Sequence, residues 1–317
     1  MRASIVIRAL NEARHLPDLL EMIKLQRTVD LDVDVEVVLV DSGSTDGTIE
    51  IAQDYGVRVT NIAKSEFSFG RSLNRGCAFS TGDILVFISG HCVPADYDWL
   101  QNLCRPLIDG KAAYSYGRQI GDDESNFSER LIFAKYFPDS SDIPQKGFFC
   151  NNANSALLRT IWESNPFDEE LTGLEDMELA KRLVSQNMSI GYVANAAVFH
   201  HHRESWAQIR RRFEREALAL RFIMPEVHLS RFDVMRYVIR SVVGDWWTAR
   251  RNGVYSTSKM EMLRYRWNQY LGSFKGNNEH RRLSQKAKEK FFYPHNSDKV
   301  EQDEWLKPVR RTSPHES

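Results

Sequence analysis

The sequence predicts an α/β fold: a mostly parallel, doubly wound (Rossmann-like) sheet in the front of the chain, followed by a basic α-helical region. Strand and helix signals alternate through the first hundred residues, which is typical of parallel sheets with right-handed crossovers. The charge changes after His202: residues 1–202 contain 18 Lys and Arg against 29 Asp and Glu, and residues 203–290 contain 20 against 9. We therefore expect units at 1–202 and 203–293, with a flexible polar tail at 294–317.

The elements of the front unit follow from hydrophobic spacing. Ser4–Ala9 is a short apolar strand, and Leu and Ile residues at helical spacing over residues 16–23 predict a helix with Asn11 as its N-cap. Val33–Val40 is apolar and β-rich, as in a parallel strand covered on both faces. The next expected elements are a helix at Thr48–Tyr55, a strand at Val57–Ile62, a helix at Arg71–Phe79 and a strand at Ile84–Ile88.

Polar residues follow the first two strands, where ligands bind in such sheets. The first strand runs into Ala9–Glu12, and the second into Val40–Thr48, with the sequence VDSGSTDGT. A carboxylate there can accept a hydrogen bond from a base or a ribose, and glycine lets the backbone approach a ligand. Asp, Ser and Gly are also common turn residues, so this segment alone leaves binding and turn formation open.

Further segments complete a recognisable set. NRG at 74–76 and TGD at 81–83 follow LNE at 10–12 and VDSGSTDGT at 40–48. This order resembles the inverting family-2 glycosyltransferases of the GT-A fold, which share a YNE turn, a VDDGSTDGT turn, an Asn-x-Gly to Gly-Asp join and an Asp-x-Asp motif. The run at 67–74, with the pattern Phe-x-x-Gly-Arg-x-x-Asn, is similar to the rhamnosyltransferase branch. The resemblance implies donor-binding roles for Asn11, Glu12, Asp41, Ser44, Asp46, Arg71, Asn74, Ser89 and Asn154.

One departure concerns the metal. Ser89–His91 stands where the family has Asp-x-Asp, so His91 falls on the metal-binding aspartate. Imidazole suits Mn²⁺ better than Mg²⁺, which prefers oxygen. The strand ending at 198–202 places His200 and His202 on one face, because side chains alternate. We expect His91, His200 and His202 to hold a divalent metal, Mn²⁺ or Mg²⁺, with a purely structural His91 as the alternative.

The segment Pro166–Leu179 resembles the family's FDE…GEDxEL stretch, in which the Asp after Glu is the catalytic base. On that match Asp176 is the base, with Glu175 beside it, although acidic residues also favour a first helical turn. The resemblance implies transfer of a sugar from a nucleotide-diphosphate donor to a glycan or lipid-linked acceptor by inverting single displacement, in surface polysaccharide biosynthesis. The alternative is a non-catalytic GT-A-like scaffold or binding subunit.

The rear region predicts helices at Arg203–Phe222, Phe232–Trp247 and Lys259–Leu271. The stretch 232–251 mixes apolar residues with Arg, which is typical of a helix on an anionic membrane, but a packed helix or an oligomer interface explains it equally. A signal peptide, an apolar run of membrane-spanning length and a CxxC pair are not found. We therefore expect a cytoplasmic protein, with the inner face of the cytoplasmic membrane as its candidate surface, and no nucleic-acid partner.

Overall fold

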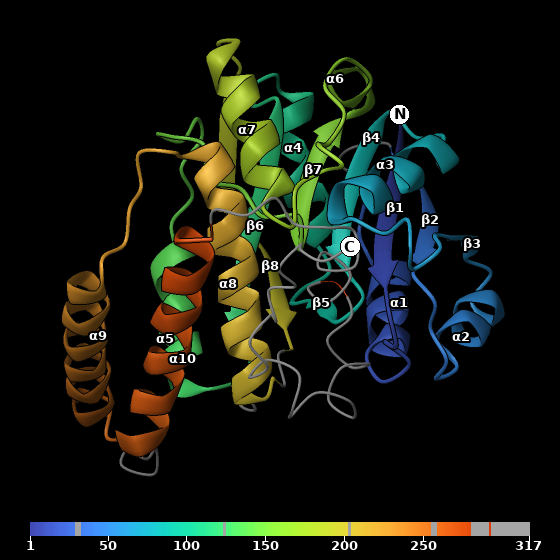
Figure 1. The fold of residues 1–317 in the computed structure, drawn as a ribbon. Helices are drawn as coiled ribbons and strands as arrows, with labels where there is room; N and C mark the ends of the chain where they lie inside the picture. The colour runs from blue at the N-terminus through green and yellow to red at the C-terminus, as the bar shows by residue number, and fades with distance from the viewer. Residues whose placement is uncertain (29–32, 123–124, 202–203, 255–258, 280–291, 293–317) are drawn as a thin grey trace, which may run out of the picture.

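The computed structural model of the chain contains a mixed sheet flanked by helices, with three long helices gathered at one side (Figure 1). It describes residues 1–28, 33–122, 125–201, 204–254, 259–279 and 292. The strands are β1 (Arg2–Ala9), β2 (Asp34–Asp41), β3 (Arg58–Asn61), β4 (Ile84–Ser89), β5 (Cys92–Pro94), β6 (Tyr114–Gly121), β7 (Asn154–Leu158) and β8 (Ile190–His200). The helices are α1 (Leu16–Lys24), α2 (Thr48–Asp54), α3 (Phe69–Phe79), α4 (Trp99–Ile108), α5 (Phe127–Tyr136), α6 (Arg159–Ser164), α7 (Glu175–Ser185), α8 (Trp206–Ile223), α9 (Arg231–Arg251) and α10 (Lys259–Asn277). The predicted α/β class and the helical rear region are confirmed.

The sheet has the strand order β3-β2-β1-β4-β7-β6-β8-β5. Strand β1 pairs in parallel with β2 and β4, and β2 pairs in parallel with β3, as the sequence predicts. Strand β7 runs antiparallel to both β4 and β6. Ala9 is in register with Asp41, Arg8 with Ser89, and Ile88 with Asn154. The beginning of β7 therefore lies at the edge where β1, β2 and β4 end.

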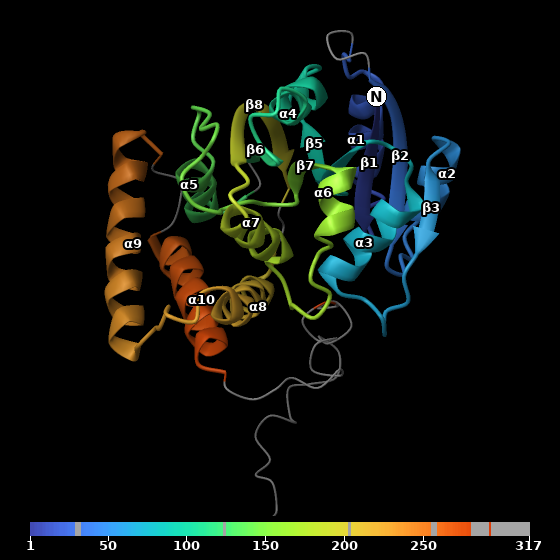
Figure 2. The ribbon, with the colours of Figure 1, turned by 90° about the horizontal axis from the view of Figure 1, so that it is seen from above.

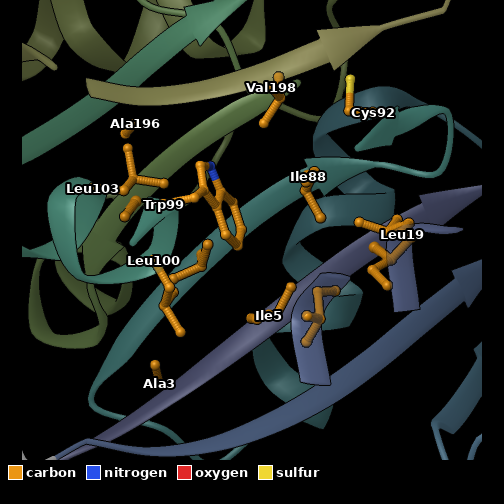
Figure 3. Close-up of a cluster of buried hydrophobic side chains, with 14 of the residues drawn as sticks. Ala3, Ile5, Leu19, Ile88, Cys92, Trp99, Leu100, Leu103, Ala196 and Val198 are labelled. Atoms are coloured by element: carbon orange, nitrogen blue, oxygen red, sulfur yellow. The ribbon is translucent and has the colours of Figure 1, made fainter. Parts of the chain in front are cut away.

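Helices cover both faces of the sheet (Figure 2). The core on one face joins the sheet to α1, α2 and α4, and the core on the other face joins it to α3, α5, α6 and α7. In the first core the fully buried Trp99 packs beside Leu100, Leu103 and Ile88 (Figure 3). Such close packing on two faces fixes the strand ends that carry the polar residues.

The first helix corrects one expectation. Helix α1 begins at Leu16, after His15, and has no side-chain cap, so Asn11 is not its N-cap. Pro17 occupies the first turn, where a missing N–H costs nothing. Asn11 instead adopts a left-handed backbone conformation (φ 58°) in the turn after β1. Its side chain is therefore available to the neighbouring loop.

The rear helices pack against one another and against α5. Gly272 and Gly276 of α10 lie so close to α8 that a Cβ on either would overlap the backbone of α8. Arg266 of α10 forms a buried ion pair with Asp245 of α9 at 2.7 Å. Helix α9 lies outermost in both views (Figures 1 and 2). No helix in the described ranges has the length and apolarity needed to cross a membrane.

Candidate active site

The loops after β1 and β2 are joined by reciprocal hydrogen bonds. The buried Asp41 carboxylate accepts hydrogen bonds from the backbone N–H groups of Gly43 (2.7 Å) and Ser44 (3.1 Å). The Asn11 N–H donates to Ser44 Oγ, and Asn11 Oδ1 accepts from the Thr45 N–H, both at 2.8 Å. Asn11, Asp41 and Ser44 therefore lie together at the edge of the sheet where β1 and β2 end.

Asp46 has a different task in the same loop. Its carboxylate accepts hydrogen bonds from Ala13 N–H and from the backbone and hydroxyl groups of Thr48. Burial alone would raise the pKa of Asp46, but these hydrogen bonds outweigh it and lower the pKa. Thr48 Oγ1 in turn accepts from the Glu12 N–H at 2.8 Å. Asp46 thus organises the loop and holds the backbone of Glu12.

Two histidines face each other beside the turn that contains Glu12. His91 Nδ1 lies 2.7 Å from Glu12 Oε1, and His200 Nδ1 lies 2.7 Å from Gln119 Oε1. A carboxylate only accepts, and the Gln119 amide nitrogen donates to Asn151 Oδ1, so both Nδ1 atoms carry their hydrogens. The Nε2 atoms of His91 and His200 are 3.1 Å apart. In two neutral rings both would present lone pairs, so this position suits a cation.

Either a proton or a metal ion meets that requirement. Burial opposes protonation of His91, but the charge and hydrogen bond of Glu12 outweigh it and raise the pKa of the imidazole. Histidine ligands characteristically donate their other ring N–H to a carboxylate or amide oxygen, as both rings do here. No cluster of three or more His, Cys, Asp or Glu side chains suited to a metal occurs within the described ranges. His202, the third predicted ligand, lies outside those ranges, and within them the His91–His200 pair offers two ligands.

Gly90 makes the Glu12–His91 contact possible. A Cβ on Gly90 would stand 2.8 Å from Glu12 Cγ and 3.2 Å from the carbonyl oxygen of Arg8. Any larger residue would displace the Glu12 side chain from its path to His91. The Ser-Gly-His sequence is therefore adapted to a carboxylate–imidazole pair at this point in the fold.

Asp176 and Glu175 begin α7 and are both buried. Asp176 Oδ2 accepts from the Asn152 N–H, and Oδ1 accepts from the Met177 N–H, each at 2.8 Å. Burial and the adjacent Glu175 charge raise the pKa of Asp176 to about 7. Glu175 Oε1 lies 3.5 Å from Arg8 Nη1. Asp176 therefore combines a fixed orientation with a proton affinity suited to general base chemistry near neutral pH.

A continuous set of contacts connects this carboxylate with the histidines. Asp176 binds the backbone of Asn152, whose neighbour Asn151 accepts from Gln119, and Gln119 binds His200. The sequence reasoning missed Gln119, Asn151 and Asn152. The asparagines precede an antiparallel strand, and Gln119 follows a register shift in β6, so a search at the ends of parallel strands passes over all three.

Four of the predicted donor-binding residues have structural partners. Arg71 and Asn74 of α3 both bind the Glu169 carboxylate, at 2.8 and 3.0 Å, and line a cavity of about 410 Å³ with Trp162. Asn154 is fully buried, where its amide accepts from the Trp99 indole and donates to backbone carbonyls. Ser89 ends β4, and its N–H donates to the Ala153 carbonyl. Contact of these four with a donor stays a prediction.

Residues 4–164 of the chain match the family described as Glycosyl transferase family 2. The O-antigen chain rhamnosyltransferase RfbN of Salmonella typhimurium is 28% identical over 216 residues, covering 64% of this chain and 67% of the relative. The O-antigen chain rhamnosyltransferase WbaN of Salmonella anatum is 28% identical over 180 residues, covering 53% and 56%. The chain thus spans little more than half the length of this second relative.

Solved structures share the fold. The mannosyltransferase PcManGT from Pyrobaculum calidifontis, solved in complex with GDP-Man and Mn²⁺, superposes with a TM-score of 0.58 at 15% identity, covering 85% of this chain and 84% of that one. Glucosyl-3-phosphoglycerate synthase from Mycobacterium tuberculosis, solved with phosphoglyceric acid, gives a TM-score of 0.50 at 22% identity, covering 70% and 78%. At these identities the likeness concerns the fold alone.

Proposed function

The chain belongs to glycosyl transferase family 2 and is a nucleotide-sugar-dependent glycosyltransferase of the GT-A fold, from which we propose its reaction in more detail. It transfers a sugar from a nucleoside-diphosphate donor to a hydroxyl of a glycan or lipid-linked acceptor, with inversion at the anomeric carbon. The observation that carries this proposal is the linkage of the buried Asp176 to the His91–His200 pair at one sheet edge.

The proposed step is a single displacement. Asp176 accepts the acceptor's proton while the acceptor oxygen bonds to the anomeric carbon. The bond from that carbon to the donor phosphate oxygen breaks, and its electron pair leaves with the diphosphate. A divalent cation held by His91 and His200 would supply positive charge for the leaving diphosphate. In this proposal the nucleoside binds beside Asn11, Asp41 and Ser44.

The relatives suggest which substrates to test first. Both Salmonella proteins are named O-antigen chain rhamnosyltransferases, so a nucleoside-diphosphate rhamnose is the leading donor and a growing surface polysaccharide the leading acceptor. The Mn²⁺ bound to the mannosyltransferase favours Mn²⁺ as the first metal to supply.

Donor hydrolysis tests the proposal without a known acceptor. The protein is incubated with a panel of nucleotide sugars, with Mn²⁺, with Mg²⁺ or with a chelator, and release of nucleoside diphosphate is followed. We expect release with one donor class and loss of release in Asp176→Asn. Binding of nucleotide sugar with no release or transfer under any condition would favour the scaffold alternative.

Helix α9 supports a further part of the proposal, a contact with the membrane that carries lipid-linked acceptors. Its exposed face carries apolar side chains at helical spacing, with Phe232 75%, Ile239 59% and Trp247 57% exposed. Arg236 and Arg240 lie on the same helix, and an apolar stripe with basic neighbours fits an anionic bilayer surface.

Flotation with liposomes tests this contact. We expect the protein to float with vesicles containing phosphatidylglycerol, less with pure phosphatidylcholine, and not after Ile239→Glu with Trp247→Glu. Equal flotation of the double variant would exclude this face. A concentration-dependent dimer that dissociates in the double variant would assign the face to a second copy of the chain.

A further inference from the structure

Two arginines meet on one aromatic ring beside the catalytic residues. The Arg8 Cζ lies 5.0 Å and the Arg215 Cζ 4.7 Å from the centroid of the Phe69 ring. Phe67 and Phe292 pack against the same ring, with centroids 5.4 and 5.6 Å away. Arg8 comes from β1 and Arg215 from α8, so elements far apart in the chain bring two positive charges to one apolar surface.

Both guanidinium groups have spare hydrogen-bonding capacity. In the described part of the chain, Arg8 Nη1 and Arg215 Nε are buried nitrogens without a hydrogen-bond partner. The only carboxylate in ion-pair range of Arg8 there is Glu175, at 3.5 Å, and no such ion pair is formed by Arg215. By contrast, Arg212 on the same helix binds the carboxylates of Glu129 and Glu204. An unsatisfied buried donor is costly, which favours a ligand that completes it.

The electrostatics agree with this contrast. Burial lowers the pKa of Arg215, and the neighbouring acidic groups do not restore it. Burial also opposes the charge of Arg212, yet Glu204 and Glu129 outweigh it and raise the pKa well above the usual value. Acidic neighbours therefore stabilise the charged form of Arg212 more than that of Arg215.

The two arginines lie between the histidine pair and Asp176. The Arg8 carbonyl accepts from the Gly90 N–H at 3.0 Å, which places Arg8 next to the His91 turn. The Arg215 carbonyl accepts from Thr172 Oγ1 at 3.2 Å, which places Arg215 against the loop that leads to Asp176. The Arg8 guanidinium lies 3.5 Å from Glu175, beside the proposed base, and its charge acts on both His91 and Asp176. An anion bound to this guanidinium would therefore adjoin both the histidine pair and the base.

We propose that Arg8 and Arg215 form a diphosphate-binding subsite, with Phe69 as the surface that orients both guanidinium groups. Arginine suits this task because its planar donor fork matches phosphate oxygens and stays charged. The inference rests on the proposed transferase function. In the transfer step, the electron pair of the breaking bond between the anomeric carbon and oxygen leaves on the diphosphate, which these N–H groups stabilise. The same chemistry would serve a diphosphate in a lipid-linked acceptor.

Titration with inorganic pyrophosphate in a chelator, at fixed ionic strength, tests the subsite without metal or turnover. We expect Arg8→Gln and Arg215→Gln each to weaken pyrophosphate binding about tenfold or more, which is about 1.4 kcal/mol. Arg8→Lys and Arg215→Lys keep the charge and should give intermediate affinities. Arg210→Gln, on the exposed side of α8, is the matched control and should bind like the wild type. Circular dichroism verifies that each variant is folded.

The outcomes separate the possibilities. Wild-type affinity in both folded Gln variants, or no wild-type saturation at millimolar pyrophosphate, would overturn the subsite while leaving any measured transferase activity in place. A raised KM for donor hydrolysis in the Gln variants would assign the subsite to the donor. Weakened pyrophosphate binding with unchanged donor hydrolysis would assign it to the acceptor.

Discussion

Replacing Asp176 by Asn tests the catalytic assignment most directly. The amide cannot accept a proton at neutral pH, so the general-base contribution of about 10²–10⁴ in rate is lost. That range corresponds to roughly 3–5 kcal/mol in the activation free energy. Asp176 accepts from two backbone N–H groups, and the amide oxygen can keep one of them. We expect turnover to collapse while nucleotide-sugar affinity stays near that of the wild type.

The same variant carries a signature in stability. The folded-state pKa of Asp176, about 7, lies above its usual 3.8, so the folded protein binds a proton that the unfolded chain releases between these values. This contribution is fully present below about pH 4 and is lost as the pH rises through about 7, a change on the order of 4 kcal/mol. The side chain at position 176 of Asp176→Asn does not titrate, so this variant does not lose stability in this way as the pH rises. Relative to the wild type, the variant should therefore gain stability as the pH rises.

Two measurements check this reasoning. Initial rates of donor hydrolysis or transfer give the loss of turnover, and urea unfolding at about pH 5 and about pH 8 gives the stability difference. The wild-type rate should also rise with pH through about 7, because the base must be ionised. A variant with more than about a tenth of wild-type turnover would refute the base assignment. Parallel stability profiles for the two proteins would refute the raised pKa.

Three further outcomes follow from the geometry. Gly90→Ala should push Glu12 away from His91 and raise the Mn²⁺ concentration for half-maximal activity about tenfold, and unchanged Mn²⁺ dependence would contradict the role of that contact. Chelation should abolish most activity, with recovery better in Mn²⁺ than in Mg²⁺ because imidazole nitrogens bind the metal; equal recovery in His91→Ala would remove His91 from the metal site. Gly276→Ala should lower the free energy of unfolding by about 1–3 kcal/mol through overlap with α8, whereas Gly244→Ala, with open space around it in α9, should leave stability unchanged or higher.

The sequence predicted the parallel half of the fold because its information is local. Apolar strands such as Ile84–Ser89 alternate with amphipathic helices, and each predicted element of that half is present within a few residues. Strand β7, at Asn154–Leu158, escaped prediction because it is short and its antiparallel pairing with β4 and β6 depends on distant partners. Hydrophobic periodicity contains no information on such partners.

The candidate site likewise contains residues that the sequence predicted and residues that it did not. His91 and His200 were expected together, and the structure brings their rings to within hydrogen-bonding distance across 109 residues. Arg8 and Gln119 gave no signal, since one is the penultimate residue of a strand and the other follows a register shift inside one. Arginine and glutamine are common in strands, and only the contacts made in the folded structure distinguish a site residue from any other.

The backbone contact between α8 and α10 has a mechanical consequence. The two glycines of α10 leave no side chain between the helices, and the Arg266–Asp245 pair ties α9 to the same assembly. Arg212 of α8 also binds Glu129 of α5, so α9 is joined through α10 and α8 to a helix that covers the sheet. If the proposed bilayer contact forms on α9, the spacing between this helix and the histidines and Asp176 would set how far a saccharide must project from its lipid anchor to reach the proposed site. Chains shorter than that span would fail to reach the base, whatever their terminal sugar.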